Sequence, residues 1–146
     1  MVSWNYRCAA LDRSETAACH HDTSKRKGEQ RDEIFKHSCG AIIPILPGLI
    51  EAGFDIINPV QINAKDMDSR RLKEEFGSQL TFWGGGVDTQ KILPFGTPDE
   101  IRRHVMGQCE ILGRDGGFVF NAVHNVQANV PVDNVVAMFD ALKDIS

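Results

Sequence analysis

A short apolar segment followed by a stretch with helical periodicity occurs four times between residue 32 and the C-terminus. Strands that are buried on both faces read as continuous apolar runs, which is typical of parallel sheets covered by helices. The pattern predicts an α/β fold of parallel (β/α) units, and periodicity leaves open whether the sheet closes into a barrel. The expected strands are residues 33–36, 54–59, 80–83 and 117–121, and the expected helices are 47–52, 68–76, 97–112 and 133–143.

Local signals define the ends of these helices. Asp68 is expected to cap the second helix and Gly77 to end it. Thr97, followed by Pro98 and by an acidic residue at position 100, has the pattern of a strong helix start. Apolar residues at helical spacing are expected to face the core: Leu72, Phe76, Ile101, Val105, Cys109, Leu112, Val135, Phe139 and Leu142.

Residues 1–31 differ from the rest of the chain in charge and in pattern. They hold six basic and four acidic side chains and show neither helical nor strand periodicity, whereas the whole chain has a net charge of -4. We expect an irregular leader over residues 1–31 and one folded domain over residues 32–146. The leader also holds two cysteines and two histidines, whose spacing resembles a metal site only superficially: Cys8, Cys19, His20 and His21.

Composition narrows the class of protein. The mildly acidic balance gives no electrostatic reason to expect binding to nucleic acid or to an anionic membrane. No apolar run approaches the ~20 residues that a membrane-spanning helix needs, and no secretory signal opens the chain. The four cysteines are therefore expected to be reduced thiols in a cytoplasmic protein.

Polar residues that suit ligand binding follow each of the four expected strands. In parallel (β/α) folds, ligands bind at the carboxyl ends of the strands, so these residues are expected to form one binding face for a small-molecule substrate. They are His37 and Cys39 after the first strand; Asn58, Gln61 and Asn63 after the second; Gly84, Gly85, Gly86, Asp88 and Gln90 after the third; and Asn121, His124, Asn125 and Gln127 after the fourth.

The most specific chemical signal is the pair His37 and Cys39. An imidazole and a thiolate two residues apart in an extended loop can reach one Zn²⁺, at ~2.0 and ~2.3 Å. The first candidate for a third ligand is His124, and Asp88 is the second. Three protein ligands would leave one position open, as in a catalytic zinc site. The alternative is that Cys39 is a small buried residue and that His37 is a hydrogen-bonded loop histidine.

Other residues also have more than one interpretation. His124 alone could be a general acid, a ligand-binding group or a structural histidine. The three glycines 84–86 either allow close approach of a ligand or form a sharp turn, and they lack the pattern of a nucleotide-binding loop. Cys109 lies on an apolar helix stripe and is expected to be part of the core.

From about Glu33 to its end, the chain resembles the C-terminal half of the uroporphyrinogen decarboxylase superfamily. The matching segments are residues 37–40 (HSCG), 51–61 (EAGFDIINPVQ), 72–77 (LKEEFG), 83–88 (WGGGVD), 96–100 (GTPDE), 120–125 (FNAVHN) and 130–135 (VPVDNV). The resemblance implies a (β/α)₈ barrel, in which the four predicted units form the second half.

Two branches of that superfamily have to be considered. The zinc-dependent methyltransferases act with a methyl-corrinoid and a thiol, and their ligands come as His-x-Cys plus a later cysteine. The resemblance therefore implies His37, Cys39 and, in place of that cysteine, His124 or a neighbour as metal ligands. The decarboxylases act on a porphyrinogen without metal or cofactor, and the segment around Asn121 and His124 looks like their last strand and loop. Their substrate-gripping arginines and key aspartate belong to the N-terminal half.

The resulting working hypothesis is a methyltransferase-like member of the superfamily, with porphyrinogen decarboxylation as the alternative. His124 and Asp88 are the predicted catalytic residues. The predicted substrate-binding residues are Asn58, Gln61, Gly85, Gly86, Asn121 and Asn125.

A third hypothesis is that the chain is a non-catalytic fragment. A (β/α)₈ barrel has about 250 residues, whereas this chain has 146. Four parallel units leave two open sheet edges, which favour pairing with another chain. We therefore expect self-association or pairing with an N-terminal half.

Overall fold

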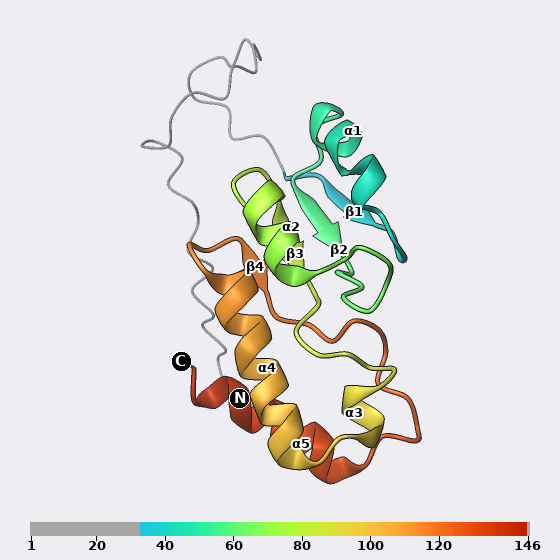
Figure 1. Cartoon of the computed structure of the whole chain (residues 1–146), viewed down its shortest axis with the longest axis vertical. Helices are drawn as coiled ribbons and strands as arrows, with labels where there is room; N and C mark the ends of the chain where they lie inside the picture. The colour runs from blue at the N-terminus through green and yellow to red at the C-terminus, as the bar shows by residue number, and fades with distance from the viewer. Residues whose placement is uncertain (1–32, 146) are drawn as a thin grey trace.

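The computed structural model describes residues 33–145, and the predicted leader, residues 1–31, lies outside that range. Four short parallel strands alternate with helices (Figure 1). The strands are β1 (Phe35–His37), β2 (Ile56–Asn58), β3 (Thr81–Trp83) and β4 (Phe118–Val119). The helices are η1 (Ile43–Ile45), α1 (Leu46–Glu51), α2 (Ser69–Phe76), α3 (Ile92–Phe95), α4 (Pro98–Gly113) and α5 (Val132–Lys143). The predicted α/β fold of parallel units is confirmed.

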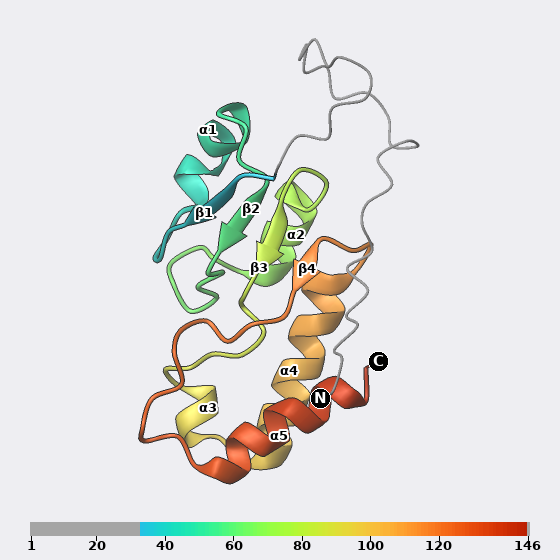
Figure 2. The ribbon, with the colours of Figure 1, turned by 180° about the vertical axis from the view of Figure 1, so that it is seen from behind.

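The order of the strands shows which kind of parallel sheet this is. The strands lie side by side in chain order, β1-β2-β3-β4, and every pair is parallel. A doubly wound sheet reverses its order to place helices on both faces, whereas a constant order with right-handed crossovers keeps the helices on one side. Figure 2 shows the sheet from the side that α1 and α2 leave uncovered. The arrangement is that of part of a (β/α)₈ barrel, with the helices outside.

The strand register divides the sheet into two different faces. Ile57 pairs with Phe82, and Phe82 pairs with Phe118. Ile57 and Phe82 are buried in a cluster with apolar residues of the helices and of the segments just before them: Ile42, Leu46, Met67, Leu72 and Leu112. The opposite face carries Phe35 and Trp83, which are 45% and 38% exposed. One face of the sheet therefore packs into the core of the domain. The other corresponds to the inner face of a (β/α)₈ barrel.

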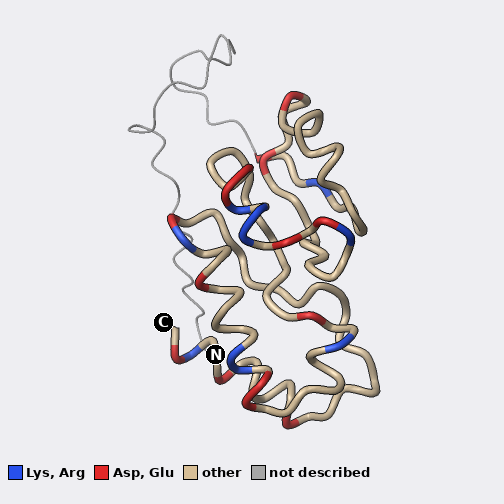
Figure 3. The backbone as a smooth tube through the Cα atoms, viewed as in Figure 1, with Lys and Arg blue, Asp and Glu red and all other residues tan. Residues whose placement is uncertain are grey.

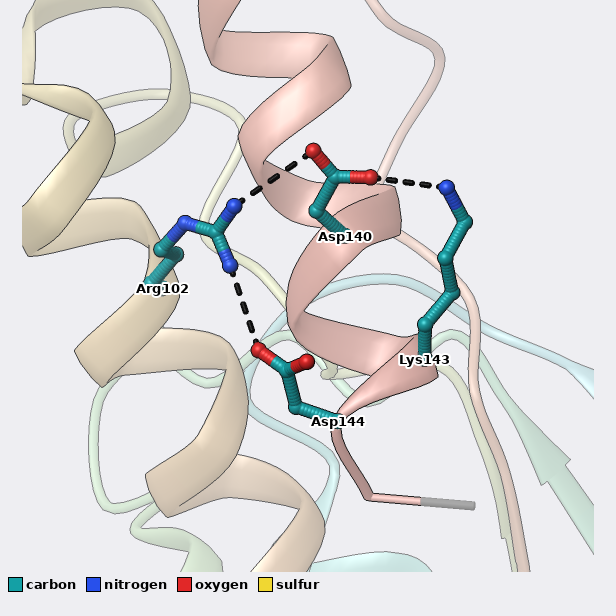
Figure 4. Close-up of polar contacts among 4 residues, drawn as sticks. All are labelled: Arg102, Asp140, Lys143 and Asp144. Carbon is teal, nitrogen blue, oxygen red and sulfur yellow. Dashed lines mark hydrogen bonds and ion pairs between the residues drawn. The ribbon is translucent and has the colours of Figure 1, made fainter.

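A second apolar cluster holds the last two long helices together. Its buried members come from α3, α4, α5 and the loop after β3: Val87, Leu93, Ile101, Val105, Ala137, Met138, Ala141 and Leu142. At its edge, Arg102 of α4 forms ion pairs with Asp140 and Asp144, and Lys143 pairs with Asp140 (Figure 4). Because these side chains are partly exposed, water screens the charges and each pair contributes little to stability. The apolar contacts provide most of the stability of this packing.

Most local predictions are confirmed. The Asp68 side chain accepts a hydrogen bond from the Arg71 N–H at 3.0 Å, and α2 ends at Phe76. Thr97 and Glu100 form a complete capping box at the start of α4. The prediction that Phe139 faces the core is wrong, since its side chain is 46% exposed. The apolar face that α5 turns to α4 is instead formed by Ala137, Met138, Ala141 and Leu142.

Helix α3 was not predicted. It has four residues and contains a proline, so it is too short to show a periodicity. Within residues 33–145, no helix is long and apolar enough to span a membrane.

Candidate functional site at the carboxyl ends of the strands

Three strands end side by side, each on a residue of the candidate site. His37 ends β1, Asn58 ends β2 and Trp83 ends β3, and His37 pairs in register with Asn58. The Ser38 N–H donates to the Asn58 carbonyl at 2.7 Å, which continues the pairing between these two strands past the end of β1. The predicted meeting of polar residues at this edge of the sheet is therefore observed for His37 and Asn58.

A line of hydrogen bonds crosses the ends of these three strands. Asn58 Nδ2 donates to the Trp83 carbonyl at 2.9 Å, and Asn58 Oδ1 lies 2.8 Å from His37 Nδ1. On the other side of the imidazole ring, His37 Nε2 lies 3.7 Å from Cys39 Sγ. Both His37 and Cys39 are exposed. The interpretation of Cys39 as a small buried residue is therefore wrong. His37 is hydrogen-bonded, as the alternative expected, but it is the last residue of β1 and not a loop residue.

The distance between His37 Nε2 and Cys39 Sγ tests whether the pair fits a zinc ion. Zinc–nitrogen and zinc–sulfur bonds of about 2.0 and 2.3 Å at a tetrahedral angle place the two ligand atoms roughly 3.5 Å apart. The observed 3.7 Å is within a small side-chain movement of that value. Within residues 33–145, no group of three His, Cys, Asp or Glu side chains is close enough to hold a metal. The pair therefore fits as two ligands, and the roles of His124 and Asp88 as a third ligand stay predictions.

His124 nevertheless lies on the same open pocket as His37. The pocket has a volume of about 530 Å³ and is lined by His37, Asn58 and Pro59 together with residues 121–127. Its volume is within the usual range for small-molecule sites, about 300–1,000 Å³. The pairing of β3 with β4 continues beyond the strands through the Val87–Ala122 bridge, which holds residues 121–123 beside the loop after β3. The predicted residues Asn121, His124 and Asn125 are thus brought together with His37 and Asn58.

The wall of this pocket carries no formal charge. Residues 116–132 contain no Asp, Glu, Lys or Arg, so the whole loop between β4 and α5 is drawn in the neutral colour in Figure 3. Amides and histidines are therefore the polar groups that line the pocket on this side. Such a surface suits a neutral or weakly charged substrate group better than a carboxylate.

Asp88 lies in a different environment from the pocket. Its side chain is 6% exposed, and Oδ1 accepts hydrogen bonds from the N–H groups of Gln90 (2.7 Å) and Lys91 (3.2 Å) and from Asn63 Nδ2 (3.3 Å). The Asp88 N–H donates to His104 Nε2 at 3.3 Å, and burial lowers the pKa of His104. These contacts stabilise the turn before α3. The catalytic role of Asp88 stays a prediction.

The predicted glycines Gly85 and Gly86 are packed closely against neighbouring side chains. A Cβ on Gly85 would come within 2.9 Å of the Val60 side chain. Gly85 also has a φ of +84°, which residues other than glycine rarely adopt. A Cβ on Gly86 would overlap the ring of Phe120. Close packing therefore explains both glycines, and their contact with a substrate stays a prediction. Gln61 supports the loop that follows β1, since its Oε1 accepts from the Gly40 N–H at 2.7 Å.

The sequence analysis missed Trp83 as a residue of the site. Its carbonyl accepts from Asn58, and its ring meets the ring of Phe35 edge to face at a centroid distance of 5.5 Å. The sequence signal for the site consists of polar side chains at the strand ends. Trp83 contributes a backbone carbonyl and an apolar ring, but its place directly before the glycines could have identified it.

Comparisons with known proteins agree with this description. Among solved structures, the chain is similar to a methyltransferase from Methanosarcina mazei, with a TM-score of 0.58 and 22% sequence identity. The similarity covers 77% of this chain and 31% of that protein, so the chain spans about a third of the methyltransferase's length. At this identity, the comparison shows a shared fold. No match was found among curated proteins.

The sequence also matches a known family. The profile described as uroporphyrinogen decarboxylase (URO-D) matches residues 16–145, which is most of the chain. The matched range begins inside the segment that the sequence analysis set apart as a leader. Together with the parallel (β/α) units, this match shows that the chain belongs to the uroporphyrinogen decarboxylase family.

Proposed function

We propose that this chain carries the zinc-binding pair of a methyltransferase-like enzyme that moves a methyl group between a corrinoid and a thiol. The observation that carries the proposal is the 3.7 Å separation of His37 Nε2 and Cys39 Sγ at the rim of an uncharged pocket. The fold shared with a methyltransferase supports it. A bound zinc ion would coordinate the substrate thiol and keep it as the thiolate near neutral pH.

The residues of this chain would then have distinct roles. His37, at the end of β1, and Cys39, in the loop that follows, would hold the metal, and Gln61 supports this loop through Gly40. The neutral pocket wall formed by residues 121–127 receives the thiol substrate without competing for the metal through carboxylates. His124 lies on that wall and would accept the proton that the thiol loses.

Metal analysis of the purified protein tests this proposal. After incubation with excess zinc and gel filtration, we expect about one zinc per chain, and Cys39→Ser and His37→Ala should each retain much less. Cys109→Ser is the matched control, because this cysteine lies on the packed face of α4 and should not affect zinc content. Cobalt in place of zinc should show a sulfur-to-cobalt absorption band that disappears in Cys39→Ser. Equal zinc content in all four proteins would contradict the proposal.

Porphyrinogen decarboxylation is the second candidate. The family match and the position of His124 on the pocket wall favour it. Against it, the pocket wall of this chain offers no Lys or Arg for the carboxylates of a porphyrinogen. If a protein without stoichiometric zinc releases carbon dioxide from a porphyrinogen, and His124→Ala does not, the second candidate replaces the first.

We further propose that a second copy of this chain covers the open sheet. The uncovered face exposes Phe35 and Trp83, and the strands β1 and β4 both lie at sheet edges. Two copies related by a two-fold axis can pair β1 of each with β4 of the other and so form eight strands. Light scattering should show a dimer, and Phe35→Ser with Trp83→Ser should weaken it. A monodisperse monomer that unfolds cooperatively would contradict this, and a monomer that gains activity only with an N-terminal half would identify the chain as a fragment.

A further inference from the structure

Both ends of the Asn58 side-chain amide form hydrogen bonds with groups from neighbouring strands. Its Nδ2 lies 2.9 Å from the carbonyl oxygen of Trp83 on β3, and its Oδ1 lies 2.8 Å from Nδ1 of His37 on β1. Both ends of the amide are therefore used within the sheet. This leaves Asn58 poorly suited to the substrate contact that the sequence analysis predicted for it.

The chemistry of these partners determines where the protons are. A carbonyl oxygen can only accept a hydrogen bond, so the NH₂ group of Asn58 must face Trp83. The oxygen of the amide then faces His37, and it also can only accept, so Nδ1 of His37 must carry a hydrogen. A neutral imidazole carries one N–H, and the other ring nitrogen has a free electron pair. Nε2 therefore turns its electron pair toward the side on which Cys39 Sγ lies, 3.7 Å away.

The Trp83 carbonyl, to which Asn58 donates, is held in place by the sheet. Gly84, directly after Trp83, donates its N–H to the Val119 carbonyl at 3.0 Å. The ring of Trp83 packs edge to face against Phe35 of β1, across β2. The carbonyl that orients Asn58 is therefore anchored to both β1 and β4, and it cannot turn without disturbing these contacts.

We infer that Asn58 is a positioning residue, which holds His37 in the Nδ1–H form and so directs Nε2, as a ligand atom, toward the side of Cys39. Only the metal-binding part of this inference rests on the proposed function. The proton position on His37 depends on the strand ends alone, and it can be measured in protein without metal.

Long-range ¹H–¹⁵N correlation spectra of ¹⁵N-histidine-labelled full-length protein test the proton position. At about pH 8, where an ordinary histidine is neutral, we expect the His37 signals to show the Nδ1–H form, with assignment from His37→Gln. Asn58→Leu should shift His37 to the Nε2–H form or to a mixture. Asn58→Asp retains an acceptor at Oδ1 and should keep Nδ1–H, and Asn63→Ala removes an amide from the same loop and should leave His37 unchanged.

Two controls separate the effect of Asn58 from a loss of structure and from an effect of the Cys39 thiol. His104 Nε2 accepts a hydrogen bond from the Asp88 N–H, so His104 should also show Nδ1–H, and it should do so in every folded variant. Cys39→Ala should keep Nδ1–H at His37 if Asn58, and not a thiol hydrogen bond to Nε2, sets the proton. The inference is wrong if His37 shows Nε2–H in the native protein. It is also wrong if Asn58→Leu leaves Nδ1–H in place while His104 reports a folded protein.

Zinc titration separates this inference from the proposed function. Loss of a residue that orients a metal-binding histidine typically lowers metal affinity about 10–100-fold, and we expect a loss of that size in Asn58→Leu but not in Asn63→Ala. If the spectra behave as expected and no variant binds zinc, Asn58 positions His37 but the zinc proposal fails. If zinc binds to native protein and to Asn58→Leu with equal affinity, the positioning role in metal binding is overturned.

Discussion

Replacement of Asn134 by alanine should lower the free energy of unfolding by about 2–3 kcal/mol. Asn134 lies in the first turn of α5 and is 3% exposed. Its Nδ2 donates two hydrogen bonds, to the carbonyls of Leu93 and Gly96, both at 2.9 Å. This one side chain therefore joins the start of α5 to the end of α3.

The magnitude follows from these two bonds. A buried carbonyl that loses its partner costs about 1–3 kcal/mol, and a partly buried one costs less. The Leu93 carbonyl belongs to the buried bond and the Gly96 carbonyl to the partly buried one. Alanine has a better helix propensity than asparagine, which offsets about 0.5 kcal/mol of this loss in stability. For a chain of this length, a net loss of 2–3 kcal/mol corresponds to a fall of about 5–10 °C in Tm.

Urea unfolding followed by circular dichroism, at one fixed protein concentration, measures this loss. Asn129→Ala is the matched control, because Asn129 is an exposed asparagine in the loop before α5 and its replacement should change stability by less than about 0.5 kcal/mol. Hydrogen exchange at the Gly96 N–H, which bonds to the Ile92 carbonyl in α3, should also become faster in Asn134→Ala. If Asn134→Ala and Asn129→Ala are equally stable, the two hydrogen bonds do not hold α3 to α5 and the reasoning is refuted.

Three further changes test other parts of the structure. Thr97→Ala removes half of the capping box of α4 and should cost about 1 kcal/mol in urea unfolding; no loss would contradict the cap. Burial lowers the pKa of His104, so unfolding takes up a proton below the ordinary histidine pKa of about 6.5, and stability should fall as the pH drops through that range. His104→Gln should flatten this pH dependence, and an unchanged slope would assign it to another group. Burial raises the pKa of Cys109 to about 11, whereas Cys39 is exposed. A thiol reagent at pH 8 should therefore modify Cys39 much faster than Cys109 in the folded protein, as read by peptide mass mapping, and equal rates would show that Cys109 is not protected.

Local sequence signals predicted the helix ends well, because caps are interactions between residues three or four apart. Asp68 and Thr97 needed no information from the rest of the chain. The orientation of α5 could not be predicted in the same way. This helix has apolar residues on two sides, and contacts with α4, including the ion pairs of Arg102 with Asp140, select the side that is buried. Phe139 is consequently on the exposed side.

The candidate site was predicted as a set of residues but not as an arrangement. Polar residues after strands indicated His37, Cys39 and Asn58, since ligands bind at that edge of parallel sheets. The role of Trp83 depends on a backbone carbonyl, which every residue has, so its side chain gave no signal. The packing around Gly85 likewise depends on Val60, from the preceding loop.

The sequence by itself determined the type, order and approximate ends of the strands and helices, because these depend on neighbours within a few positions. It also determined that a histidine and a cysteine lie two residues apart where the first strand ends. Only the tertiary structure decided that Asn58, 21 positions after His37, forms a hydrogen bond with its ring, and that Asn58 is itself held by Trp83 a further 25 positions along the chain. The reason is the register of parallel strands, which brings together the ends of β1, β2 and β3, and this register is set by the packing of the whole sheet against its helices.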